Sequence, residues 1–457
     1  MGLSPAKPAG TSSPSRGPEL GAILNLIVSA IAAGGIVAPL TNAVSNAGFV
    51  CTPLIYALTA LWATYASLTL VKASVLVGGD SMPAVAHAAM GSIAGYVVEA
   101  IVTANAFACG MTAMAAWSDL WDRDMLEGLH RHAFLAIGAA VIFPPILVIR
   151  TMQACELLSI VTLISALLFL GTVLVKAAQP CVVLPELTPC DLDAGTSGEA
   201  VDEGLIYAFS IALNSFVVQF NVLDIYHSTA RPDAAGGGES ATAAARSFSC
   251  QVYTSMGVLF ALYCAIAMLS YSSFGSTDYA DILSSYKSLS TGGFSLSFLA
   301  LGQLLSIPLV TLPAIKVLSR RLLPVVASMR RASPAKTEAS ALVAEADEDS
   351  GWDARLAHMV VATVWTLSML FLCMAFGDLE VMLALFGTVT GLPLLCIVPP
   401  LLLLQCESTR QGEQGAALLH KVMLAAGIVV TIAGVAVSAS RASLNEDVPD
   451  KDSSRFL

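Results

Sequence analysis

The chain has 457 residues, of which 56% are hydrophobic and only 12% are charged. Its mean hydropathy of +0.76 and recurring apolar runs of about 20 residues exclude a soluble domain and indicate an integral, multi-pass membrane protein. The net charge of −11 identifies no partner, because charge in such proteins is distributed by topology. We expect the lipid bilayer as a partner and no nucleic acid, and the oligomeric state stays open.

The chain begins with a Pro-, Ser- and Gly-rich segment, residues 1–20, which predicts a disordered cytosolic tail and no cleavable signal peptide. An all-helical, polytopic transporter domain is predicted from residue 21 to residue 440, followed by a short non-cytosolic tail, 441–457. About eleven membrane spans are predicted in this domain. Together they form one compact bundle. The predicted spans are residues 21–43, 49–71, 92–118, 133–150, 155–177, 204–226, 252–274, 294–318, 355–376, 379–404 and 417–440.

The basic residues predict how these spans are oriented. With the N-terminus in the cytosol, 15 of the 22 Lys and Arg residues fall on the cytosolic side and 7 on the other, as the positive-inside rule expects. The odd number of spans then places the C-terminus outside or in a lumen. The longest connection, residues 319–354, begins basic and turns acidic, which predicts a flexible cytosolic loop. The plasma membrane and a vacuolar or lysosomal membrane both remain open as hosts.

The first span is interrupted by Gly34, Gly35 and Pro39. In a helix interior Gly costs about 1 kcal/mol and Pro about 3 kcal/mol relative to Ala. At membrane depth, freed backbone groups are tolerated where protein or a watery cavity satisfies them. The pattern favours a broken helix whose backbone binds something, and a simple kink is the alternative.

The sixth span lacks Gly and Pro after its first residue but carries Asn214, Ser215, Gln219 and Asn221 at mid-to-late depth. Intramembrane amides must find partners, and they mark either a substrate route or contacts between helices. In transporters built from two inverted halves of five helices, the first and sixth spans occupy equivalent places and both are discontinuous. We weigh contacts between helices and contacts with substrate equally at this stage.

Signals for enzymes and metal centres are absent from the sequence, which has no Walker-type loop, His-Glu-x-x-His or Gly-x-Ser-x-Gly motif. We expect a protein that is not an enzyme, with no metal and no cofactor other than a coupling ion. Glu99, in the third span, is the best candidate for a proton-coupling carboxylate, although a solvated or capping role is the simpler explanation. Cys181 and Cys190 share a non-cytosolic loop, where an oxidising compartment would favour a disulfide.

Six segments in chain order resemble those of one family. The first span reads LNLIVSAIAAGGIVAPLTNAVSNAGF, and the third ends ACGMTAMAAWSDL. The later segments are NVLDIYHSTARP at the end of the sixth span, YSSFGSTDYADIL at the end of the seventh, SIPLVTLPA in the eighth and GDLEVMLALFGTVTGLPLLCIVPPLLLL in the tenth. On these motifs the chain resembles the amino acid/auxin permease family, transmembrane amino acid transporters similar to the sodium-coupled neutral amino acid transporters, within the amino acid/polyamine/organocation superfamily.

The resemblance implies a leucine-transporter-type fold, with five plus five inverted helices and one more, and secondary active transport of amino acids by alternating access. It also implies a substrate site made of Ala33, Gly34, Gly35, Ile36, Thr112, Phe216, Gln219 and Asn221. The first four offer free backbone amides to the substrate carboxylate, as a half-helix N-terminus attracts an anion. The last three face the amino group or side chain, and Thr112 lines the site.

The coupling ion is either H⁺ or Na⁺. In sodium-coupled members an Asn in the first span and a Thr in the eighth help to hold the ion, and the matching positions here are Ser29 and Ser306. A hydroxyl is a poorer fixed oxygen ligand than an amide carbonyl, because it must orient a lone pair toward the cation. These departures favour proton coupling. Sodium-coupled transport and a non-transporting amino acid sensor or regulatory membrane subunit are the alternatives.

Overall fold

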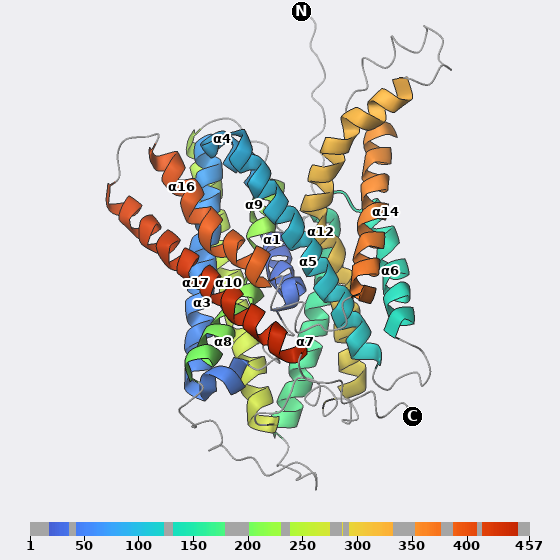
Figure 1. The fold of residues 1–457 in the computed structure, drawn as a ribbon, viewed down its shortest axis with the longest axis vertical. Coiled ribbons are helices and arrows are strands. Elements are labelled where there is room, and N and C mark those ends of the chain that lie inside the picture. The colour runs from blue at the N-terminus through green and yellow to red at the C-terminus, as the bar shows by residue number, and fades with distance from the viewer. Residues whose placement is uncertain are drawn as a thin grey trace, which may run out of the picture.

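The computed structural model describes residues 18–35, 43–122, 131–178, 201–229, 238–274, 286, 292–331, 352–375, 387–408 and 414–446. Within these ranges every element is a helix (Figure 1). The first elements are α1 (Pro18–Ala30), η1 (Ile31–Gly35), α3 (Ala43–Val77), α4 (Met82–Met90), α5 (Ser92–Asp122), α6 (Arg131–Val148), η2 (Met152–Cys155) and α7 (Glu156–Ala178). They are followed by α8 (Val201–Ser215), α9 (Gln219–Thr229), α10 (Gly238–Phe274), α12 (Gly292–Arg331), α14 (Trp352–Ala375), η5 (Gly387–Gly391), η6 (Pro393–Ile397), α16 (Val398–Ser408) and α17 (Gln414–Glu446).

These helices confirm the predicted all-helical membrane fold. Ten helical segments of the described chain are long and apolar enough to cross a membrane, and the shorter apolar helix Leu20–Ala33 corresponds to the predicted first span. α8 and α9 together make the sixth span, and η5, η6 and α16 make the tenth. Each predicted span therefore has a helical counterpart.

Several helices differ from the predicted boundaries. α12 continues to Arg331 instead of ending at residue 318, so the first part of the segment predicted as a loop is helical. An ion pair between Arg321 Nη2 and Glu99 Oε2 of α5, at 2.8 Å, holds this extension against the bundle. α14 begins at Trp352, before the predicted end of the loop. α4 has nine residues and is missed by a prediction based on span length, because it is too short to cross a bilayer.

The centre of the bundle is formed by the sixth and eighth spans. In the most apolar window of Ala208–Thr229 and of Gly292–Ser328, 83% of residues are buried, whereas the figure for Ala417–Val437 is 17%. α12 packs against α5, α7 and α14, while α3 packs against α10 and α8. α1 packs against α7, α9 and α10. The first and sixth spans thus meet in the interior, and α17 lies at the edge of the bundle (Figure 1).

Candidate functional site

The first span departs from the α-helix at the predicted place. α1 gives way to η1, a π-helical segment that contains Gly34 and Gly35. π-helical turns close on i→i+5 hydrogen bonds and occur frequently at functional sites. Ala33, in the same segment, is buried, and Ile36 lies outside the described residues. The predicted interruption of the first span is confirmed as a departure from α-helical geometry. Pro39 lies outside the described residues, and the use of this segment as a carboxylate site stays a prediction.

The sixth span is also broken, at Phe216, Val217 and Val218, which belong to neither α8 nor α9. Val217 N–H donates to Asn214 O at 3.1 Å, an i→i−3 bond that tightens the end of α8. Val218 N–H instead donates to Gln219 Oε1 at 3.0 Å. The break needs neither Gly nor Pro, because adjacent β-branched residues and side-chain amides compete with the helix. The discontinuity expected from two inverted halves is present.

Asn221 connects the two broken spans to α12. Its Nδ2 donates to Ser29 Oγ of α1 at 2.9 Å and to Leu309 O of α12 at 3.3 Å. Leu309 O can accept because Pro313, four residues later, has no N–H to donate. Ser29 Oγ in turn donates to Asn25 O at 2.7 Å. Asn221 and Ser29 are both fully buried, so a residue predicted to bind substrate contacts a residue predicted to hold the ion.

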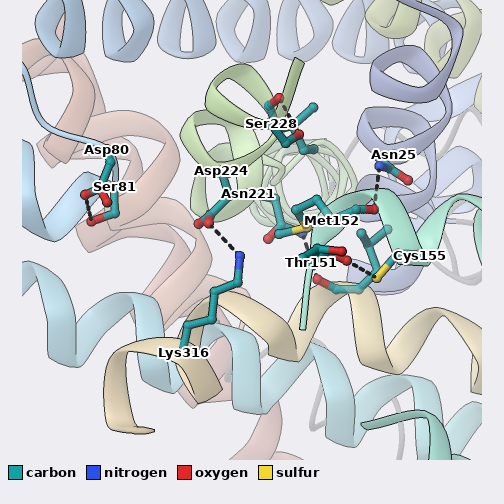
Figure 2. A network of polar contacts seen from close by, with 12 residues as sticks. Asn25, Asp80, Ser81, Thr151, Met152, Cys155, Asn221, Asp224, Ser228 and Lys316 are labelled. Atoms are coloured by element: carbon teal, nitrogen blue, oxygen red, sulfur yellow. Dashed lines mark hydrogen bonds and ion pairs between the residues drawn. The ribbon is translucent and has the colours of Figure 1, made fainter. Parts of the chain in front are cut away.

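Further polar contacts extend toward the predicted cytosolic ends of the helices. Figure 2 shows Asn25 of α1 reaching η2, where its Nδ2 donates to Met152 O at 3.2 Å. It also shows Lys316 of α12 pointing to α9, where its Nζ donates to Asp224 Oδ1 at 3.2 Å. On the predicted cytosolic side of the breaks, the first span is therefore bonded to η2 and the sixth span to α12.

Two predicted residues of the sixth span face away from α12. The Phe216 ring packs against Tyr56 of α3 and Tyr263 of α10, with ring centroids 6.3 and 5.2 Å away. Gln219 Nε2 donates to Ala63 O of α3 at 3.4 Å. These side chains anchor the break to α3 and α10. Among the three predicted residues of this span, Asn221 is the one whose side chain points to α1 and α12.

A second polar cluster lies on the α8 side of the break. Thr390 Oγ1 of η5 donates to Asn105 Oδ1 of α5 at 3.1 Å. A Cβ added at Gly387 would lie 2.6 Å from Asn214 Cγ, and one added at Gly391 would lie 2.8 Å from Asn214 Oδ1. The two glycines therefore let η5 approach the Asn214 amide closely. Sequence reasoning missed Asn105 and Thr390, although isolated polar residues in apolar spans were a usable signal.

The hydrogen bonds of Asn221 do not include the remaining predicted residues. Ser306 Oγ donates to Gln303 O of its own helix at 2.6 Å, and Thr112 is buried on α5. Glu99 accepts two hydrogen bonds from Arg321, at 3.2 and 2.8 Å, away from the breaks. Their roles stay predictions. Cys181 and Cys190 lie outside the described residues.

Comparison with known proteins gives one family. Residues 19–442 match the family model described as transmembrane amino acid transporter protein. No curated protein matches the chain. Among the residues with described structure, no three His, Cys, Asp or Glu side chains lie together so that they could hold a metal ion.

Solved structures show the same fold at low sequence identity. A mutant of the Eremococcus coleocola manganese transporter has a TM-score of 0.53 and 12% identity, covering 98% of this chain and 92% of that one. A second mutant gives 0.52 and 13%, with the same coverage. The transporter in complex with an aromatic bis-isothiourea substituted compound gives 0.53 and 11%, covering 95% of this chain and 89% of that one. Such identities establish likeness of fold alone.

Proposed function

Because the chain belongs to the transmembrane amino acid transporter protein family, we propose that it is a secondary active transporter that moves amino acids across a membrane by alternating access, driven by a proton gradient. The observation that carries this proposal is the pair of breaks in α1–η1 and α8–α9. The two breaks lie in the interior of the bundle, where η1 packs against α8 as well as α5 and α12.

Paired breaks suit a zwitterion. The C-terminal end of α8 carries partial negative charge from its last carbonyls, and a helix N-terminus carries partial positive charge from its first N–H groups. An amino acid presents one ammonium and one carboxylate, which such ends can stabilise without any ionised side chain. The backbone around Gly34 and Gly35, where the resemblance places the carboxylate, would take that group, and the end of α8 would take the ammonium.

The orientation of the Asn221 amide supports proton coupling over sodium coupling. Its Nδ2 donates to Ser29 Oγ and Leu309 O, two oxygens that a bound cation between α1 and α12 would need as ligands. Because an amide nitrogen is a donor only, it fills the place of a cation there. Glu99 remains the candidate for the coupling carboxylate.

Uptake into proteoliposomes tests the proposal. Purified protein is reconstituted, and entry of radiolabelled amino acids is compared under an inward proton gradient in sodium-free buffer and under a sodium gradient at equal pH. We expect the proton gradient alone to drive accumulation above equilibrium. Strict dependence on sodium would refute proton coupling. Saturable binding without uptake under either gradient would refute transport and favour the sensor alternative.

A further inference from the structure

One buried amide near the breaks has no hydrogen bond at either end. Gln303 of α12 is 1% exposed, and neither its Nε2 nor its Oε1 finds a partner in the structure as described. An unsatisfied buried polar group costs about 1–3 kcal/mol, so such a group in a packed interior points to a missing partner. Asn221 Oδ1 is buried and unsatisfied in the same way.

Gln303 lies at the depth of the break in the first span. Ser29 of α1 and Leu309 of α12 are level with each other, because both bind the Asn221 amide. The first and eighth spans cross the bundle in opposite directions. Gln303 precedes Leu309 by six residues, which is about 9 Å of helix, and the same step from Ser29 ends at Gly35. Gln303 is therefore level with the end of η1.

Gln303 also lies on the face of α12 that points to the interior. Gly302 faces α7, because a Cβ added there would meet Ser165. Thr311 faces α5, because its Cγ2 would lie 3.2 Å from a Cβ added at Gly110. Those two directions are opposite, because nine residues at 100° per residue end half a turn apart. Leu301 and Leu305, two positions to either side of Gln303, are less buried and lie about 160° around the helix from it, so Gln303 points away from them and into the bundle. η1 is one of the elements that pack against both α5 and α12, beside α6, α9 and α14.

The stretches that surround the breaks contain no ionisable side chain that could pair with a charged substrate side chain. Asp, Glu, Lys, Arg and His are all missing from residues 20–35, 100–118, 204–223, 292–315 and 387–406. Burying an unpaired charge there would be costly. A neutral amide that offers one donor group and one acceptor instead fits a neutral, polar side chain.

We infer that Gln303 is a specificity-determining residue that binds the substrate side chain, and that it selects neutral amino acids bearing an amide or a hydroxyl over apolar ones of equal size. The inference rests on the proposed transport of amino acids and adds the chemical class of the substrate side chain. The backbone at the breaks holds the ammonium and carboxylate, so the Gln303 amide is free to satisfy the side chain. A site that hydrogen-bonds a polar group rejects an analogue that lacks it, because the amide is then left unpaired.

The test compares pairs of amino acids of matched shape in competition for uptake. Asparagine against leucine and threonine against valine are the pairs, measured for the wild type and for Gln303→Met. We expect the wild type to prefer the polar member of each pair, and the variant to lose about tenfold of that preference, the value of one net hydrogen bond. Thermal unfolding of the purified, substrate-free protein gives a second readout. Gln303→Met should unfold at an equal or higher temperature, because it removes two unsatisfied atoms.

Gln251→Met is the matched control. Gln251 is also a buried glutamine with an unsatisfied Oε1, but it lies on α10. Its substitution should leave the preference unchanged. A wild type that takes up leucine as well as asparagine overturns the inference without the need for any variant. Equal preference in wild type and Gln303→Met, or equal loss in both variants, overturns it as well. Failure of the wild type to transport any amino acid would instead refute the proposed function.

Discussion

At the scale of single residues, two asparagines share the surroundings of the break in the sixth span. Asn221 donates to Ser29 and Leu309 on the α9 side. Asn214, on the α8 side, fits against the glycines of η5. Each amide is held by a different neighbour, so each can be tested separately. The test of Asn221 addresses the proposed ion coupling, and the test of Asn214 addresses how closely the tenth span approaches the sixth.

Asn221→Asp is expected to make transport depend on sodium. The substitution replaces the donor with an oxygen, which can no longer bond Leu309 O and leaves a buried negative charge. A sodium ion between this carboxylate, Ser29 Oγ and Leu309 O would compensate the charge. Uptake by the variant should fall at least tenfold in choline buffer and recover in part in sodium buffer. Asn25→Asp, whose amide contacts Met152 O instead, should lose activity without recovery. Equal uptake in both buffers for Asn221→Asp would contradict this account.

Gly387→Ala is expected to destabilise the protein because the added Cβ overlaps the Asn214 amide, 2.6 Å from both Cγ and Nδ2. Overpacking of this kind costs about 1–3 kcal/mol, which should lower the unfolding temperature and reduce uptake. The double variant with Asn214→Ala removes the overlapping atoms and should recover part of the loss. Gly257→Ala on α10 is the control, because nothing lies within 4 Å of its added Cβ. An unfolding temperature that falls equally for both single variants would show that the overlap is not the cause.

At the scale of elements, α12 combines length with interruption. It is a helix of 40 residues with Pro308, Pro313 and Pro324 inside it. Each proline removes one N–H from the ladder and frees the carbonyl four residues earlier. At Pro313 the freed group is Leu309 O, and Asn221 of α9 supplies the missing donor. The proline therefore converts an intrahelical bond into a bond between the sixth and eighth spans.

Pro313→Ala should separate helix stability from transport. Alanine restores the N–H and favours the helix interior by up to about 3 kcal/mol relative to proline, so the variant should unfold at an equal or higher temperature. The new N–H competes with Asn221 for Leu309 O, and uptake should fall several-fold. Pro324→Ala, in the same helix but nearer its end, provides the control and should keep full uptake. If Pro313→Ala keeps full uptake as well, the Asn221–Leu309 bond has no part in transport.

At the scale of the whole molecule, two groups of helices meet at the breaks, and α7 packs against both of them. The first group consists of α1, α3, α8, α9 and α10. Phe216 and Gln219 attach the sixth span to α3 and α10, and α1 packs against α10. The second group consists of α5, α6, α12 and α14, which pack against one another. The Asn221–Leu309 and Asp224–Lys316 bonds cross between the groups, whereas Glu99 and Arg321 pair within the second group.

The sequence predicts those features that depend on residues close together in the chain. It does not predict those that depend on how distant segments pack. The spans are readable because twenty apolar residues in a row are a local property, and Gly34 and Gly35 mark the first break for the same reason. The second break has no Gly or Pro, and it was expected from the two inverted halves rather than from its residues. Gln303 was missed because its lack of a partner is a property of the packed bundle. The same holds for the Asn105–Thr390 bond, which joins spans 285 positions apart.

Crosslinks between and within the two groups should have opposite effects on transport. Alternating access requires relative movement of the groups, so a short crosslink across their boundary must stop it, whereas one inside a group need not. Asp224→Cys with Lys316→Cys joins α9 to α12 across the boundary, at a pair now separated by 3.2 Å. Glu99→Cys with Arg321→Cys joins α5 to α12 within the second group, at a pair separated by 2.8 Å.

Both double variants lose an ion pair, so each is compared with itself before and after treatment with a short bifunctional thiol reagent that a reducing agent can cleave. The readout is exchange of labelled for unlabelled amino acid at equal pH on both sides, because exchange does not need Glu99 as a coupling carboxylate. Exchange should stop on crosslinking in the first variant, return on cleavage, and stay constant in the second. Equal inhibition of both would show that the boundary does not lie between these groups, because α5 and α12 would then also have to move apart.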